Sequence, residues 1–247
     1  MKRSKILSKS DIDNEAVAFL KENSPNSLQK LGMLDLESIA ELKLGLKIEY
    51  QKLDEDGELL GMTIFKTGYV DVFDENNTIC KKKFEKGTIV LNEILINDLK
   101  LQGRYQFTLA HELGHWILHR KEFIEDENQI NLFEIVGNAT ENDYIKCLNR
   151  DVEYNNVIAN KLKTDLDWLE WQSNYFGASI LMPRRLIKQY YLNNCNSKVI
   201  KQMSKEISEI CGVSKQAAEI RIKDTNDDKD LKNQMVMEGI NYVKIMY

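Results

Sequence analysis

A change of hydrophobic period near residue 97 constrains the fold of this chain more than any other feature. Between residues 46 and 92, apolar side chains such as Leu46, Ile48 and Tyr50 alternate with polar ones, and turn signals separate the alternating runs. From residue 97 onward, apolar side chains recur at steps of three and four residues, which is the period of an amphipathic helix. We therefore expect an α+β fold in which a small, mostly antiparallel sheet packs on a helical core.

Helices are also expected on both sides of these segments. Asp35 can cap a helix that ends before Gly45, and Asp167 can cap another that ends at Met182, before Pro183. The remaining expected helices cover residues 12–22, 130–136, 184–193, 198–211 and 215–223.

Composition limits the classes of protein to consider. The 247 residues contain 43% hydrophobic and 30% charged side chains, which is typical of a soluble protein with a sizeable core. A net charge of -5 disfavours a general nucleic-acid or membrane-surface binder. No apolar run approaches the roughly 18 residues of a membrane span, and no apolar signal segment follows the basic start. We expect a cytoplasmic protein with no membrane partner, whose four cysteines are reduced thiols.

Residues 111–115 read His-Glu-Leu-Gly-His and lie within the helical pattern after residue 97. Because residues i and i+4 share one face of a helix, the imidazoles of His111 and His115 can reach the same Zn²⁺. Glu112 lies at an adjacent position, from which it can take a proton from a metal-bound water. Gly114 costs about 1 kcal/mol of helix propensity relative to alanine, so we expect close approach by another group there, with the sheet as the candidate.

A third histidine follows the motif at position 119. On a straight helix, His119 lies about 12 Å along the axis from His111, so one ion cannot bind all three imidazoles. We expect His119 to pack beside the site or to stabilise the helix C-terminus.

A catalytic zinc needs a third protein ligand and an open position, and the composition leaves carboxylates as the candidates. Glu170 stands out because it lies in a strongly amphipathic helical segment. Asn174, four residues later on the same face, could accept the free ring N–H of a ligand histidine. From spacing alone, Glu170 could equally be a solvated helix carboxylate. The other candidates are Glu122, Glu125, Asp126, Glu127, Glu134, Glu153, Asp165 and Asp167.

Two stretches of sequence carry a family resemblance. Residues 107–115 read Phe-Thr-Leu-Ala-His-Glu-Leu-Gly-His, and residues 170–178 read Glu-Trp-Gln-Ser-Asn-Tyr-Phe-Gly-Ala before Leu-Met-Pro at 181–183. Together they resemble the ImmA/IrrE metallo-endopeptidases, whose second pattern is Glu-x-x-Ala-Asn-x-Phe-Ala followed by Leu-Met-Pro. The chain departs mildly from it, with Ser173 and Gly177 where alanine is usual. The resemblance covers roughly residues 35–223.

The resemblance implies a zinc-dependent endopeptidase with a zincin-like active-site helix. It implies that His111, His115 and Glu170 bind one Zn²⁺ per chain and that Glu112 is the catalytic glutamate. It also implies a protein substrate, namely a helix-turn-helix transcriptional repressor of a mobile element or a stress response.

Two further features of such a site can be sought in the sequence. An oxyanion stabiliser is expected among the tyrosines near the second motif, with Tyr175 as the candidate beside Tyr190 and Tyr191. An extended substrate is expected to pair with an exposed sheet edge, for which residues 88–92 are the candidate.

The two motifs are 55 residues apart, from His115 to Glu170, which is longer than the family resemblance leads us to expect. We interpret residues 121–165 as an insertion that serves as a lid or recognition element. The chain is then one peptidase domain over residues 1–223 followed by a tail. Within this domain we expect a helical N-terminal part (1–45) and a helical C-terminal part (184–223). The tail covers residues 224–247.

Residues 198–223 suggest an alternative. They read as helix, a turn at Gly212, and helix, with six basic and three acidic residues, which is compatible with a helix-turn-helix. The side chains that could contact DNA are Lys215, Gln216, Arg221 and Lys223. In this alternative the chain is a non-catalytic regulator with a metallopeptidase fold that binds DNA or a repressor through these helices. The resemblance instead implies that they cover the peptidase core, so direct nucleic-acid binding is not expected.

Overall fold

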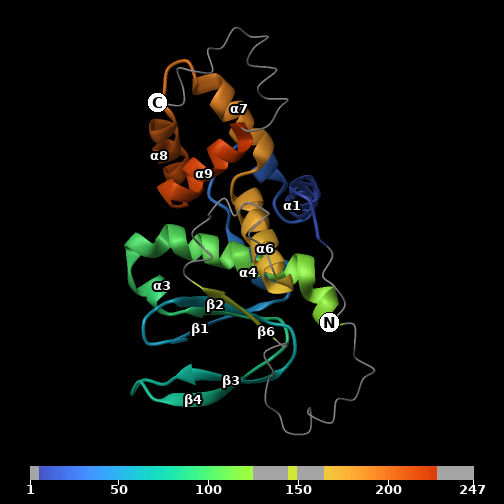
Figure 1. Cartoon of the computed structure of the whole chain (residues 1–247), viewed down its shortest axis with the longest axis vertical. Coiled ribbons are helices and arrows are strands. Elements are labelled where there is room, and N and C mark those ends of the chain that lie inside the picture. The colour runs from blue at the N-terminus through green and yellow to red at the C-terminus, as the bar shows by residue number, and fades with distance from the viewer. Residues whose placement is uncertain (1–5, 125–143, 149–163, 227–247) are drawn as a thin grey trace.

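The computed structural model describes residues 6–124, 144–148 and 164–226. It shows helices stacked on one face of a small sheet, with a separate β-hairpin beneath the sheet (Figure 1). The α+β class predicted from the change of hydrophobic period is therefore confirmed.

The main sheet has the strand order β1-β5-β2-β6. Strand β5 (Thr88–Asn92) pairs parallel with β1 (Lys47–Gln51) and antiparallel with β2 (Leu59–Ile64). Strand β6 (Tyr144–Leu148) pairs antiparallel with the other side of β2. Strands β3 (Gly68–Phe73) and β4 (Ile79–Phe84) form the hairpin. The sheets are thus mostly antiparallel, as expected, except for the β1–β5 pair.

One expectation about the sheet is wrong. Residues 88–92 do not form an exposed edge, because β5 lies between β1 and β2 and is hydrogen-bonded to both. Of the predicted insertion over residues 121–165, the structure describes residues 121–124, 144–148 and 164–165, and the rest lies outside the described residues. The zinc-motif helix continues to Ile124, and residues 144–148 add strand β6 to the sheet.

Helices cover most of the remaining described chain. They are α1 (Lys9–Asn23), α2 (Leu36–Ser38), α3 (Ile94–Asn97), α4 (Gln102–Ile124), α6 (Asp165–Leu181), α7 (Arg184–Asn194), α8 (Ile200–Cys211) and α9 (Lys215–Asn226). A π-helical turn (Ile39–Lys43) follows α2, and short 3₁₀ turns occupy Pro25–Leu28 and Leu99–Leu101. Among these helices, none is both long and apolar enough to span a membrane.

The caps of two helices follow from local chemistry. The side chain of Asp35 accepts the Ser38 N–H and caps α2, as predicted. At α6 the cap is Thr164 rather than Asp167. Thr164 accepts the Asp167 N–H, and the Asp167 side chain accepts the Thr164 N–H in return, which makes Asp167 the third residue of a capping box. The helix predicted over residues 130–136, and residues 227–247 of the predicted tail, lie outside the described residues.

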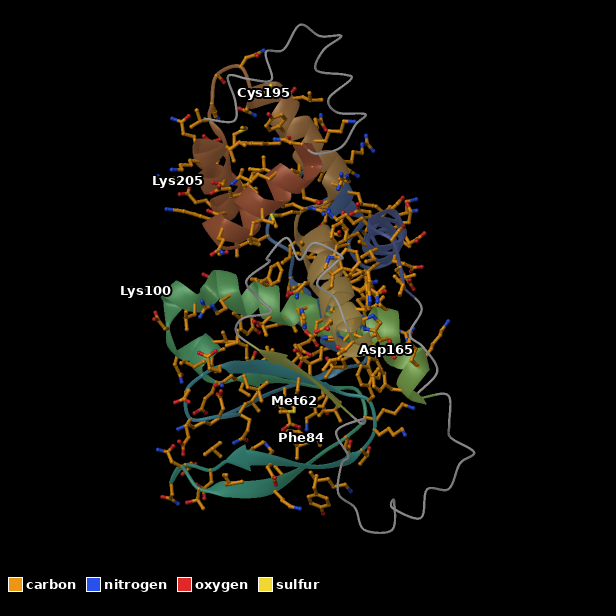
Figure 2. All side chains as sticks on the ribbon, viewed as in Figure 1. Met62, Phe84, Lys100, Asp165, Cys195 and Lys205 are labelled. Carbon is orange, nitrogen blue, oxygen red and sulfur yellow. The ribbon has the colours of Figure 1, made fainter. Side chains whose placement is uncertain are left out.

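Helix α4 lies across the sheet, and α6 crosses α4 on the side away from the sheet (Figure 1). The main apolar core joins α1, α4, α6 and the C-terminal helices around buried residues such as Ile12, Leu109, Phe176 and Ile222. A smaller cluster fills the space between the main sheet and the hairpin, where Met62 and Phe84 are found (Figure 2). The crossing of α4 and α6 therefore lies between the sheet and the helical core.

Candidate metal centre

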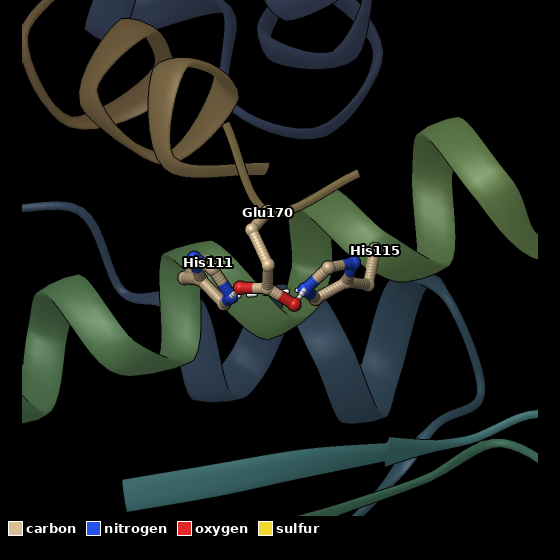
Figure 3. Close-up of side chains that lie close together, drawn as sticks. All are labelled: His111, His115 and Glu170. Carbon is tan, nitrogen blue, oxygen red and sulfur yellow. Dashed lines mark hydrogen bonds and ion pairs between the residues drawn. The ribbon is translucent and has the colours of Figure 1, made fainter. Parts of the chain in front are cut away.

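Helix α4 presents His111 and His115 on the face that α6 crosses, and α6 directs Glu170 between them (Figure 3). Glu170 Oε2 lies 3.2 Å from His111 Nε2, and Glu170 Oε1 lies 3.3 Å from His115 Nε2. Among the described residues, these three form the only group of metal-ligating side chains whose ligand atoms all lie within 4.8 Å of one another. The structure thus brings together the three residues that the sequence proposed as ligands.

The hydrogen bonds around His111 show that these atoms suit a shared cation. Asn174 Oδ1 lies 3.1 Å from His111 Nδ1 and accepts its N–H, as predicted from the i+4 spacing to Glu170. The lone pair of a neutral His111 is then on Nε2 and faces the Glu170 carboxylate. Both carboxylate oxygens of Glu170 are buried and have no hydrogen-bond partner among the described residues. A divalent ion bound to Nε2 and the carboxylate would satisfy all of these atoms.

Glu112 lies on the face of α4 that meets strand β2. Thr63 Oγ1 donates to Glu112 Oε2 at 2.6 Å, whereas Glu112 Oε1 is buried without a partner among the described residues. Gly61 makes room for this carboxylate, because a Cβ at that position would lie 2.8 Å from Oε1. Sequence reasoning missed Thr63 and Gly61. The available signal was a hydroxyl and a glycine within the otherwise apolar strand Leu-Leu-Gly-Met-Thr-Ile.

The two carboxyl groups are driven to opposite protonation states. Complete burial raises the pKa of Glu112 to about 8, and the neighbouring His111 and the Thr63 hydroxyl offset only part of this effect. Burial also acts to raise the pKa of Glu170, but in the metal-free site the attraction and hydrogen bonds of protonated His115 and His111 outweigh it and lower that pKa to about 2. Glu170 is therefore the anion that a metal ligand must be, and Glu112 is the carboxyl able to exchange a proton near neutral pH.

Comparison with known families agrees with this geometry. Residues 65–144 match the Peptidase_M78 family model, the IrrE N-terminal-like domain. The resemblance recognised from the two motifs is thus confirmed, and the chain has a metallopeptidase-type fold. No curated protein matches the sequence. The matched range includes the His-Glu-x-x-His motif but ends before Glu170, so this ligand depends on the motif at 170–178 and on the geometry described above.

The second histidine of the IrrE-like motif has two neighbours at its other ring nitrogen. Ser173 Oγ lies 2.9 Å from His115 Nδ1, and His119 Nδ1 lies 3.3 Å from the same atom. His119 is buried beside the site, which was one of the two positions expected for it. It does not cap the helix, because α4 continues to Ile124. The sequence motif marks Ser173 only by its departure from alanine, although its position three residues after Glu170 places it on the same helix face.

Two glycines allow the helices to cross closely at the site. A Cβ on Gly114 would lie 3.0 Å from both the Cα and the carbonyl oxygen of Ser173, and a Cβ on Gly177 would lie 3.2 Å from the backbone nitrogen of His111. The close approach predicted at Gly114 is present, but the neighbour is helix α6 and not the sheet. The mutual position of the ligands is therefore set by backbone contact between α4 and α6.

The predicted oxyanion stabiliser lies in a different group of side chains. The Tyr175 hydroxyl donates to Asp13 at 3.1 Å and accepts from Arg184 at 3.1 Å. Arg221 also donates to Asp13 at 3.0 Å and is fully buried. We call this group the buried charge cluster; it comprises Lys9, Asp13, Tyr175, Ser179, Arg184, Arg221 and Asp224. Its geometry gives no support to an oxyanion role for Tyr175.

The other carboxylates and tyrosines considered from the sequence do not join the metal centre as it is described. Glu122 and Asp165 are exposed, and Asp167 belongs to the α6 capping box. The hydroxyl of Tyr190 donates to Glu206. The candidates Glu125, Asp126, Glu127, Glu134 and Glu153 lie outside the described residues.

Proposed function

We propose that this chain is a zinc-dependent endopeptidase that hydrolyses a peptide bond in a protein substrate. The observation that carries the proposal is the convergence of His111, His115 and Glu170 on one point beside Glu112, a buried carboxyl group with one oxygen that has no partner in the described part of the chain. The match to the IrrE N-terminal-like domain supports the same class of protein.

In the proposed mechanism, His111, His115 and Glu170 would hold one Zn²⁺ per chain. When bound, the ion polarises the scissile carbonyl and lowers the pKa of a water molecule toward 7. Glu112 Oε1 takes a proton from the attacking water, because Thr63 already occupies Oε2. The raised pKa of Glu112 then favours its return of that proton to the leaving amine near neutral pH.

We further propose that an extended peptide approaches from the β6 side of the sheet. The edges of the described main sheet are β1 and β6, since β5 and β2 lie between them. Strand β2 carries Thr63, which contacts Glu112, and β6 is the direct neighbour of β2. Strand β1 is separated from β2 by β5 and is therefore farther from the catalytic carboxyl group.

The identity of the substrate rests on the family resemblance alone. We propose a helix-turn-helix repressor of a mobile element or a stress response, and a cytoplasmic location in keeping with such a partner. Cleavage of the repressor would release transcription of the genes that it represses.

The alternative of a DNA-binding regulator loses a predicted contact. Arg221, one of the four side chains considered for DNA contacts, is fully buried, where its Nε donates to the Met182 carbonyl at 3.0 Å. The adjacent Ile222 is also buried in the core. Helix α9 thus packs against the rest of the molecule, as the resemblance implied for this region.

The proposed activity is tested by incubating the zinc-loaded protein with two probes, reduced casein and the helix-turn-helix repressor encoded nearest to its own gene. Wild-type protein should cut at least one of them, and Glu112→Gln should cut neither while retaining zinc. Equal cleavage by both proteins would show that the reaction does not depend on this carboxyl group. Fragments are identified by mass spectrometry.

A further inference from the structure

One face of helix α6 supplies polar groups to both imidazoles of the metal centre. Glu170, Ser173 and Asn174 occupy positions i, i+3 and i+4 of the helix and therefore lie side by side. Asn174 is hydrogen-bonded to His111, Ser173 lies within hydrogen-bonding distance of His115, and Glu170 reaches both rings. Each imidazole is thus contacted by a different residue of the same helix turn.

The two nitrogens of His115 have different surroundings. Its Nε2 lies 3.3 Å from Glu170 Oε1 and 2.9 Å from His111 Nε2, which is where the metal ligands converge. Its Nδ1 lies 2.9 Å from Ser173 Oγ and 3.3 Å from His119 Nδ1. When Nε2 binds a metal, a neutral ring carries its hydrogen on Nδ1, so Nδ1 must donate. Ser173 Oγ is the nearer acceptor for this hydrogen.

Burial makes this hydrogen bond important. His115 and Ser173 are fully buried, so an Nδ1–H that lost its partner would lack water to replace it. Such a loss is unfavourable because the buried donor gives up its hydrogen bond without regaining its hydration. The serine also has little freedom to move, because its Cα and carbonyl oxygen pack against Gly114 at the helix crossing. The backbone contact between α4 and α6 therefore fixes the distance between the hydroxyl and the ring.

We propose that Ser173 is a positioning residue whose hydroxyl accepts the Nδ1–H of His115 and holds Nε2 toward the metal. It acts through His115 and does not touch the ion or the substrate. The inference rests on the proposed metal site but not on peptidase activity, so metal binding alone can test it.

The decisive variant is Ser173→Ala, which removes only the hydroxyl oxygen. Its apparent dissociation constant for Zn²⁺ at pH 7, measured by competition with a chromophoric chelator, should rise on the order of 10-fold, the lower end of the range for lost support of a ligand histidine. The matched control is Ser179→Ala on the same helix, whose hydroxyl belongs to the buried charge cluster. The control should lower the melting temperature and leave zinc affinity unchanged.

A second readout separates positioning from general loss of structure. The visible spectrum of the Co²⁺-loaded protein reports ligand geometry, and it should change in Ser173→Ala but not in Ser179→Ala. Unchanged zinc affinity in Ser173→Ala would overturn the proposal. So would equal losses of affinity in the two variants, or a larger loss in His119→Gln than in Ser173→Ala. If the wild-type protein binds no zinc, both this inference and the proposed function are wrong; zinc binding without cleavage would count against the function alone.

Discussion

Helix α6 takes part in two buried polar groups that differ in one respect. Around Glu170, the carboxylate oxygens have no hydrogen-bond partner among the described residues, and Glu112 Oε1 nearby is in the same state. Around Tyr175, five residues further along the helix, the acids and bases of the buried charge cluster are paired with one another. Arg221 bonds to Asp13, for example, and Arg184 bonds to Asp224 at 3.0 Å.

This difference indicates that the metal centre serves to bind a ligand, whereas the buried charge cluster supports the fold. Desolvated polar groups are costly unless they are paired, so the cluster supplies its own partners and links α1, α6, α7 and α9. Within the described ranges, the metal centre leaves comparable groups without partners, and a bound ion would supply the missing interactions. Variants in the two groups should therefore lose different properties.

The largest expected effect is the loss of zinc in Glu170→Gln. A neutral amide is a poor zinc ligand, so tight binding should disappear, and His111→Ala or His115→Ala should have the same result. Glu112→Gln is the matched control, because it changes a carboxyl group beside the site and removes no ligand. Metal analysis after dialysis measures the zinc that each variant retains per chain. Full zinc in Glu170→Gln would show that a carboxylate outside the described residues is the third ligand.

Arg221→Met should instead lower stability without abolishing zinc binding. It leaves the buried Asp224 and the half-buried Asp13 without one of their partners, which should cost about 3 kcal/mol in the free energy of unfolding, the lower end of the range for a broken buried pair. Lys223→Met on the same helix is the control, since the Lys223–Glu219 pair is exposed and should contribute less than about 1 kcal/mol. Urea denaturation of the two variants measures the difference. Equal effects would mean that the cluster does not support the fold.

The metal-free protein should also show a pH-dependent effect of Glu112. Its pKa is about 8 when folded, against an ordinary value of 4.5, so the folded state binds more protons than the unfolded state between these values. Stability should therefore fall as pH rises through this window and level off above pH 8. Glu112→Gln cannot ionise, and its advantage over wild type should grow from pH 5 to pH 8. Urea denaturation of both proteins from pH 5 to pH 8 measures this difference in the free energy of unfolding. A difference that stays constant with pH would contradict the raised pKa.

The smallest expected effect is that of Gly114→Ala. The added methyl group would lie 3.0 Å from the Ser173 backbone, so the two helices must separate slightly, at a cost of about 1–3 kcal/mol. Zinc affinity should fall as well, because the ligands come from both helices. Gly32→Ala is the control, with nothing within 4 Å of its new Cβ. A melting temperature for Gly114→Ala equal to that of the control would show that the crossing tolerates a side chain.

The helices that carry the ligands could be predicted from sequence because the spacing of the ligand residues within each helix is a local pattern. His111 and His115 lie four residues apart on a helix that the apolar period indicates, and Asn174 stands in the same relation to Glu170. The sequence predicts the cap of α6 three residues late, because Thr164 and Asp167 form one capping box and either polar side chain can be taken for the cap.

The features that sequence missed depend on contacts between distant segments. The alternating pattern places β5 in a sheet but does not say that β1 and β2 flank it. Strand β6 lies in a polar, acidic stretch without a strong period, and its pairing with β2 becomes apparent only in three dimensions. The low helix propensity of Gly114 indicates a close neighbour, but only the structure identifies Ser173 as that neighbour.

Two of the ligands at the metal centre, His115 and Glu170, are separated in sequence by residues 116–169. An ion coordinated by His111, His115 and Glu170 would therefore be a cross-link that closes this stretch into a loop. Part of its binding free energy would become folding free energy, as in other proteins whose ligands come from separate segments. If the loop were cut, coordination bonds would still hold the two fragments together. A chelator would then release the fragments, as a reductant releases two chains joined by a disulfide.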